Sequence, residues 1–250
     1  MAKKHPPIIM FDLDGVLLNS RAHLLVAMQA LTDSTNRWNH LVASTTTGLE
    51  VLRLVESGAR ARNYATIKAM MQNLVELIPS RISRILFLAK YNRTVNKIEW
   101  EYSHFFPGIG ETLNKLAKKG IILGAATNSY GYRIKKWLEL ANLSHLIQFY
   151  TSRDDRKVLG SKPSPKPLFG LLVKMKRHYK WGRIDLNRVA FVGDNITDIL
   201  AAKRARVKSI AVKSGHAYPE ELSIMKPDFL LKDVNEIPSI LNQLFPNMDD

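Results

Sequence analysis

The chain has no cysteine among its 250 residues. This absence excludes disulfide bonds, thiolate metal sites and thiol nucleophiles, so any chemistry must use oxygen and nitrogen side chains. Long hydrophobic runs are also lacking near the start. The first apolar run, residues 8–11, ends at Asp12 and is too short for a signal-peptide core or a membrane span. We therefore expect a cytoplasmic protein with no membrane partner.

Acidic residues are few compared with basic ones: 22 Asp and Glu stand against 37 Lys and Arg, a net charge of +15. Such a balance favours contact with polyanions or anionic substrates, although a basic surface without a specific partner explains it equally well. Hydrophobic residues make up 46% of the chain and charged residues 24%, which is typical of a folded protein with a packed core. We expect a monomer or a homodimer.

Short, unbroken apolar runs followed by small or polar residues recur along the chain. They are typical of strands that are buried on both faces of a parallel sheet, and they lie at 8–11, 121–126, 189–192 and 209–212, with weaker candidates at 146–150 and 228–231. Helix-length patterns lie between them at 110–119, 132–141, 165–179 and 197–205. This alternation predicts an α/β fold with a doubly wound, Rossmann-like parallel sheet.

Residues 20–104 interrupt this alternation with long helical apolar patterns and no convincing strand. We interpret them as an inserted helical domain within a core of residues 1–19 and 105–250.

Two basic clusters each have two possible interpretations. Arg53, Arg60 and Arg62 could bind an anionic leaving group, but the favoured interpretation is that they are solvent-exposed charges on a helix. Aromatic and basic residues interleave at 174–181 and could bind nucleic acid, but an exposed basic helix end with one anchored aromatic is favoured.

Four aspartates lie at or just beyond the ends of predicted strands. Asp12 and Asp14 follow the first strand, Asp194 follows the strand at 189–192, and Asp198 lies four residues further on. Ligands of open α/β sheets bind beyond the carboxyl ends of the strands. One such aspartate is more often a helix cap or a turn residue. Four in register instead favour a site for a hard divalent cation, and Mg²⁺ is the natural candidate.

The segment Phe-Asp-Leu-Asp-Gly-Val-Leu-Leu-Asn-Ser at 11–20 resembles the first motif of the haloacid dehalogenase superfamily, DxDG. Three further motifs follow in the order of that family: Thr127 at the end of an apolar strand, Lys162 in Lys-Pro-Ser-Pro, and Gly-Asp-Asn-Ile-Thr-Asp at 193–198. The resemblance covers nearly all of the chain outside 20–104. It implies a Mg²⁺-dependent phosphohydrolase with a helical cap, similar to the phosphoglycolate phosphatase and β-phosphoglucomutase branch.

The resemblance also implies roles for the first two aspartates. Asp12 would be the nucleophile that forms an aspartyl phosphate. Asp14 would act as general acid and then general base, and would bind the metal through its backbone carbonyl. Dehalogenases lack an acid at the position of Asp14. Phosphonoacetaldehyde-cleaving relatives also lack it and use an early cap lysine, whereas the first lysine of this insertion is Lys68. Phosphate-ester chemistry is therefore favoured.

The later motifs supply the remaining implied roles. The hydroxyl of Thr127 and the backbone amide of Asn128 would hold phosphoryl oxygens, and Lys162 would neutralise the nucleophile and the phosphoryl group. Asp194 would be a direct Mg²⁺ ligand, and Asp198 would coordinate the metal directly or through water and orient Lys162.

The expected substrate is a small-molecule phosphate ester, with phosphoglycolate as one candidate. Three alternatives stay open at this point. A sugar phosphomutase would share every core residue, and the charge of +15 raises the alternative of a phosphatase acting on nucleic-acid ends. A catalytically silent binding module is disfavoured because every candidate catalytic position holds a competent side chain.

Overall fold

The computed structural model describes residues 5–20, 103–155 and 160–246, together with 80–82, 84–86, 89, 93 and 100. The chain forms two compact units. The first unit consists of Met1–Asn19 together with Phe105–Asp250, and the second consists of Ser20–His104. In the second unit, residues 81–82, 84–86, 89, 93 and 100 are helical. The other helices that we predicted there lie outside the described residues, as do Arg53, Arg60, Arg62 and Lys68.

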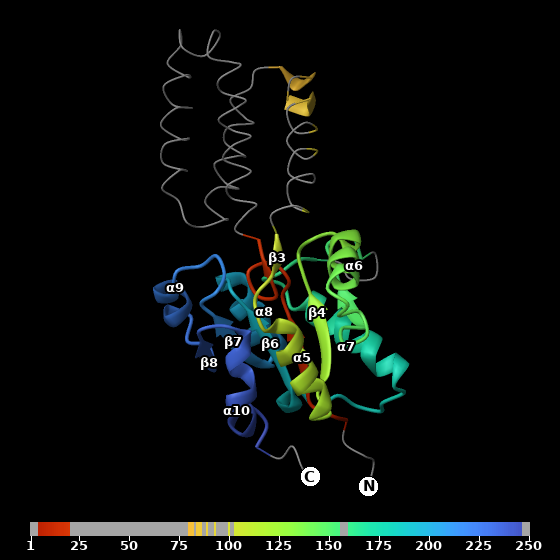
Figure 1. Ribbon diagram of the computed structural model, residues 1–250, viewed down its shortest axis with the longest axis vertical. Coiled ribbons are helices and arrows are strands. Elements are labelled where there is room, and N and C mark those ends of the chain that lie inside the picture. Colours follow the sequence, from red (N-terminus) through yellow and green to blue (C-terminus); the bar gives the residue numbers. More distant parts are fainter. Residues whose placement is uncertain are drawn as a thin grey trace. The chain divides into compact units, whose positions relative to one another are not determined.

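The first unit, hereafter the core, is built on a six-stranded sheet (Figure 1). Its order is β5 (Phe149–Thr151), β4 (Ile122–Ala126), β1 (Ile8–Phe11), β6 (Val189–Gly193), β7 (Lys208–Val212) and β8 (Phe229–Leu231). All neighbours pair in parallel. Strand β1 lies in the middle and is completely buried, which is why its sequence has no polar residue. The predicted α/β fold with a doubly wound parallel sheet is confirmed.

Helices connect and cover the strands: α5 (Ile109–Lys118), α6 (Gly131–Leu140), α7 (Lys166–His178), α8 (Ile196–Ala205), α9 (Pro219–Ile224) and α10 (Ile237–Leu244). Helix α7 contacts α8, and α8 contacts α9, whereas α5 contacts α10. The predicted helices at 110–119, 132–141, 165–179 and 197–205 correspond to α5 to α8. None of the described helices combines the length and the apolar character that crossing a membrane requires.

One apolar cluster joins β1 and β6 to helices α7 and α8. Met10 and Phe191 pack with Leu171 of α7 and with Ala201 and Ala205 of α8, and all five are nearly or completely inaccessible to solvent. The small alanines allow α8 to approach the sheet closely. The strands that end at the candidate site are therefore held on a rigid base.

One strand begins later than its sequence pattern suggested. We expected a strand at 146–150, but β5 covers Phe149–Thr151. The backbone amides of Leu146 and Ile147 donate to the carbonyl of Leu143 at 3.0 and 3.1 Å, so this apolar stretch closes a turn after α6 before the strand starts. Two further strands, β2 (Leu18–Asn19) and β3 (His104–Phe105), pair with one another. Each has two residues, which is too few for a recognisable pattern.

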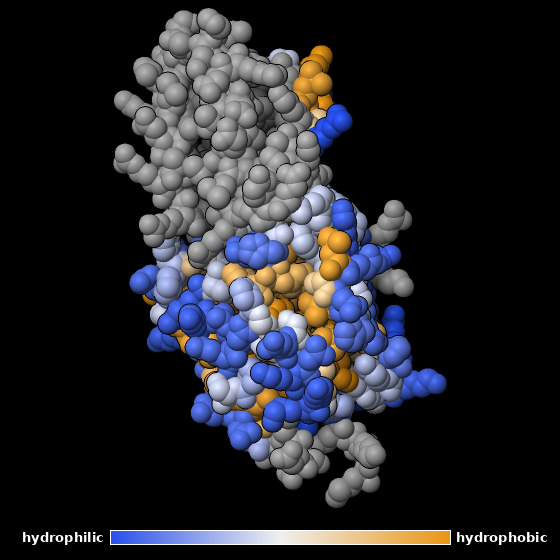
Figure 2. All heavy atoms as spheres, viewed as in Figure 1, coloured by the Kyte–Doolittle hydropathy of each residue, from blue (hydrophilic) through white to orange (hydrophobic). Residues whose placement is uncertain are grey.

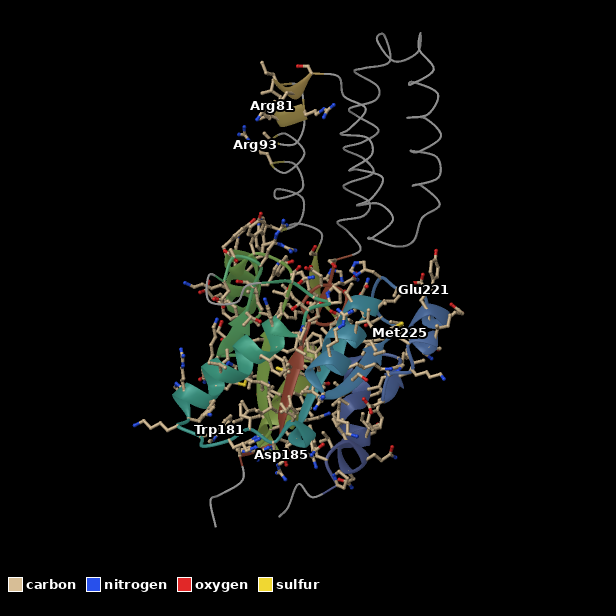
Figure 3. The ribbon with its side chains drawn as sticks, turned by 180° about the vertical axis from the view of Figure 1, so that it is seen from behind. Arg81, Arg93, Trp181, Asp185, Glu221 and Met225 are labelled. Atoms are coloured by element: carbon tan, nitrogen blue, oxygen red, sulfur yellow. The ribbon has the colours of Figure 1, made fainter. Side chains whose placement is uncertain are left out.

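The aromatic residues after α7 lie at the amino-terminal edge of the sheet. Figure 3 shows Trp181 and Asp185 together at this end of the core. Trp181 stacks on Tyr179 with ring centroids 4.8 Å apart and packs against the apolar cluster, and the amide of Asp185 donates to His5 at 2.8 Å. Trp181 and Tyr179 are therefore remote from the carboxyl ends of the strands, where the predicted site residues lie. Hydrophilic residues cover most of the visible face of the described core (Figure 2).

Candidate active site

Three predicted site residues directly follow three adjacent strands. Strand β1 pairs with β4 on one side and β6 on the other, with Phe11 opposite both Ala125 and Val192. Asp12, Thr127 and Asp194 therefore emerge at the same edge of the sheet. The adjacency that would let Asp12 and Asp194 converge is present.

Two glycines allow the loops after β1 and β7 to close on Asp194. Gly15 has a φ of +79°, and a Cβ added there would lie 2.2 Å from an oxygen of Asp194. A Cβ added to Gly215 would lie 2.0 Å from the same oxygen. Since real Cβ atoms do not approach so closely, both positions require glycine for this packing.

Lys162 bridges two of the predicted aspartates. Its Nζ lies 2.8 Å from Oδ1 of Asp12 and 2.7 Å from Oδ1 of Asp198, and its side chain is 2% exposed. Burial disfavours its charge, but the carboxylates of Asp12 and Asp198 outweigh that effect and hold the pKa of Lys162 above its usual value. Lys162 therefore carries a fixed positive charge beside the carboxylate of Asp12.

The side chain of Asn128 fixes the backbone of Lys162. Its Oδ1 accepts from the Lys162 amide at 3.0 Å, and its Nδ2 donates to the Lys162 carbonyl at 3.3 Å. Sequence reasoning assigned only the backbone amide of Asn128 and missed this pair, because it joins loops that are 34 residues apart. These two hydrogen bonds fix the backbone position from which the side chain of Lys162 extends.

We expect Asn128→Ala to reduce activity about 10- to 100-fold, because a displacement of the order of 1 Å at the base of Lys162 misplaces its ammonium. The loss of two hydrogen bonds should also lower the free energy of unfolding by about 1–3 kcal/mol. Steady-state kinetics and denaturant unfolding measure both. The matched control is Asn114→Ala, which removes an exposed hydrogen bond to the carbonyl of Gly110 on α5. Equal activities of the two variants would contradict the role of Asn128.

Both carboxylate oxygens of Asp198 have partners among the described residues. Its Oδ2 accepts from the backbone amides of Asp194 and Asn195 at 3.2 and 3.1 Å, within the capping box that starts α8, while its Oδ1 faces Lys162. A Cβ at Gly193 would lie 2.1 Å from Asp198. These contacts leave Asp198 suited to orienting Lys162 and the turn that carries Asp194.

His216, in the loop after β7, is a residue that sequence reasoning missed. Both its backbone amide and its Nδ1 lie near Oδ2 of Asp194, at 2.7 and 2.9 Å. Burial opposes its charge, yet the hydrogen bond and charge of Asp194 raise the pKa of His216 above its usual value. No motif surrounds it in the sequence, and only the adjacency of β6 and β7 reveals it. His216 fixes the orientation of the Asp194 carboxylate.

The carboxylates of Asp12, Asp194 and Asp198 form one cluster, with ligand oxygens all within 4.8 Å of one another. Burial, together with the charges of Asp198 and Asp194, raises the pKa of Asp12 to about 7 despite the opposing charge of Lys162. Oδ2 of Asp12 and Oδ1 of Asp194 receive no hydrogen bond from the described residues. An excess of negative charge with two available oxygens fits a divalent cation.

The carboxylate of Asp14 points to a different set of partners. Ser129 donates its hydroxyl to Oδ2 at 2.6 Å, and both terminal nitrogens of Arg133 approach Asp14 at 3.2 Å. Ser129 also donates its amide to Oγ1 of Thr127 at 3.0 Å, which leaves the Thr127 hydroxyl proton free to donate elsewhere. Neither Ser129 nor Arg133 was predicted, although both lie within six residues of Thr127.

The sequence matches the haloacid dehalogenase-like hydrolase family over residues 9–212. It is 27% identical to phosphoglycolate phosphatase of Escherichia coli (strain K12), over 92% of this chain and 90% of that protein. Identity to phosphoglycolate phosphatase of Vibrio cholerae is 28%, over 94% and 96%. A crystal structure described as a predicted phosphoglycolate phosphatase from Haemophilus somnus superposes with a TM-score of 0.68 at 22% identity, over 94% of this chain and 97% of that one.

Proposed function

The chain belongs to the haloacid dehalogenase-like hydrolase family, and we propose that it is a Mg²⁺-dependent phosphatase that cleaves phosphate monoesters of small metabolites. The observation that supports this most directly is the buried contact between Asp12 and Lys162, at 2.8 Å, beside the carboxylate of Asp194. An ionised carboxylate held by a fixed ammonium is a competent nucleophile in a water-poor site. The same ammonium can hold the oxygens of an incoming phosphate.

In this proposal, Asp12 attacks phosphorus. A bond forms between its carboxylate and phosphorus while the ester bond to the leaving oxygen breaks, and a proton from Asp14 goes to that oxygen. Water then attacks phosphorus in the aspartyl phosphate and gives a proton to Asp14. The bond between phosphorus and the Asp12 oxygen breaks, so inorganic phosphate is released and the carboxylate of Asp12 is regenerated. Lys162 and the Thr127 hydroxyl stabilise the phosphoryl oxygens in both steps.

The cation would be held by Asp12, Asp194 and the backbone carbonyl of Asp14. Bound Mg²⁺ supplies positive charge that neutralises the carboxylates and the phosphate dianion. Asp198 would act beside it by orienting Lys162, because its own oxygens already accept two backbone amides and face that ammonium. His216 would keep the second oxygen of Asp194 turned toward the cation.

We propose a phosphoglycolate-like substrate, supported by the named activity of the Escherichia coli and Vibrio cholerae relatives. We also propose that residues 20–104 form a cap that supplies substrate contacts. The nucleic-acid alternative, which the net charge of +15 raised, stays a prediction. Trp181, in the aromatic and basic stretch at 174–181, lies at the amino-terminal edge of the sheet.

The test is phosphate release from a broad panel of phosphate esters, with Mg²⁺ and with a chelator. We expect turnover that falls at least about 100-fold on chelation, since a bound cation contributes several kcal/mol to such a transition state. Added Mg²⁺ should restore it. A protein that releases no phosphate from any ester, or that does so equally well in the chelator, would contradict the proposal.

A further inference from the structure

Arg133 lies on the first turn of α6 and faces the carboxylate of Asp14. One of its terminal nitrogens lies 3.2 Å from Oδ1 and the other 3.2 Å from Oδ2, the two-pronged geometry that matches a guanidinium to a carboxylate. Its side chain is only 12% exposed. Because arginine does not lose its charge, this fork always offers two positive donors to whichever carboxylate lies before it.

The proposed chemistry requires Asp14 to reach the ester oxygen that leaves phosphorus. Arg133, which contacts Asp14, must then lie near the leaving group rather than near the transferred phosphate. Lys162 and the metal serve the phosphate side of the site. On the leaving-group side, the guanidinium of Arg133 offers a fork that is matched to a carboxylate, and Asp14 occupies it in this structure.

We infer that Arg133 is a specificity-determining residue that binds a carboxylate on the leaving group. This inference rests on the proposed function. The substrate carboxylate takes the place of Asp14 on the guanidinium and leaves Asp14 to the ester oxygen. Since Arg133 and the ester oxygen are both within contact of Asp14, the carboxylate must lie within about one or two carbons of that oxygen. The substrate class is the phosphate esters of short hydroxy acids.

A neutral leaving group cannot make this exchange. It would leave Arg133 bound to Asp14 and would gain no contact with the fork. The enzyme should therefore discriminate between two esters of nearly equal size that differ in this one charge. Such discrimination is a ratio of kcat/KM values, in which losses that affect both substrates cancel.

The experiment compares 2-phosphoglycolate with 2-hydroxyethyl phosphate, its neutral counterpart. For the unmodified protein we expect kcat/KM to favour the carboxylate by about 100-fold, the size expected for a desolvated charge pair. In Arg133→Met the ratio should fall to near one. Arg133→Lys, which keeps the charge but loses the fork, should give an intermediate ratio.

A purely structural role for Arg133 would give a different result. Misplacement of Asp14 slows both esters alike and leaves the ratio unchanged. The matched control is Lys135→Met, which removes a positive charge two residues along the same helix, where Lys135 is exposed and pairs with Glu139 at 3.8 Å. Its ratio should equal that of the unmodified protein.

Two outcomes would overturn the inference while leaving the proposed function intact: equal kcat/KM for both esters in the unmodified protein, or an unchanged ratio in the arginine variants. If Arg133→Met fails to fold, Arg133→Lys decides, and an unchanged ratio in that variant counts against the inference. Absence of phosphate release from every ester in the unmodified protein would instead overturn the proposed function, and the inference with it.

Discussion

Asp12→Asn should reduce Mg²⁺-dependent phosphate release by about 10³-fold or more, the usual scale for removing a nucleophile. The amide is nearly the same size as the carboxylate, so its oxygen can still accept from the amide of Leu13 and from Lys162, as Oδ1 does at 2.8 Å in each case. It cannot form a stable acyl phosphate. The assay is phosphate release from 2-phosphoglycolate at saturating Mg²⁺.

The same substitution should not weaken the fold. Burial raises the pKa of Asp12 in the folded protein to about 7, above its ordinary value of 3.8. Ionising Asp12 therefore costs the folded state stability, a cost that grows as pH rises from about 4 to about 7 and then stays constant. Without Mg²⁺, Asp12→Asn should match the unmodified protein at about pH 4 and be at least as stable at about pH 8.

The matched control is Asp233→Asn, which alters a 3₁₀-helix cap where Asp233 accepts from the amide of Asn235 at 2.8 Å. It should keep full activity. An Asp12→Asn variant that turns over as fast as this control would show that another group attacks phosphorus. A variant that is inactive and also much less stable at about pH 8 would point to a structural role for Asp12.

The central strands of the core could be predicted because they are short, largely apolar and buried. Residues 8–11 and 189–192 contain no polar residue, and 209–212 contains only Ser209. Such apolar runs suit central parallel strands. The candidate site followed from the same logic, because the polar residues directly after such strands meet at one edge of the sheet. That argument placed Asp12, Thr127 and Asp194 together.

The contacts between loops could not be predicted in this way. His216 and Arg133 lie in segments without a distinctive pattern, and they meet Asp194 and Asp14 only because β7 and α6 bring them there. The amide pair between Asn128 and Lys162 likewise depends on loop conformation. Periodicity identifies elements, whereas side-chain pairing between loops depends on their three-dimensional path.

Lys162→Met should have the second large effect, on stability as well as on activity. Lys162 is the cation that lies between the buried carboxylates of Asp12 and Asp198. Removing one partner of a buried ion pair costs about 3–5 kcal/mol, because the remaining charges stay buried without compensation. For a chain of this size the expected fall in Tm is on the order of 10 °C. Activity should fall about 10³-fold, because the phosphoryl group loses a fixed positive charge.

Lys208→Met is the matched control for stability. Lys208 also faces an aspartate, Asp228, but at 3.9 Å and with about two fifths of each side chain exposed. Exposed pairs contribute about 1 kcal/mol or less, so Tm should change little. If Lys162→Met melted at the same temperature as this control, the two carboxylates would not depend on the ammonium of Lys162.

The double variant Lys162→Met with Asp198→Asn separates charge balance from catalysis. It removes one negative charge together with the positive one, so it should regain part of the Tm lost in Lys162→Met. The amide side chain introduced at position 198 would also keep an oxygen to accept the amides of Asp194 and Asn195, which Oδ2 of Asp198 accepts at 3.2 and 3.1 Å. Activity should not return, because no ammonium faces the phosphoryl group. Recovery of activity together with Tm would mean that Lys162 serves the fold alone.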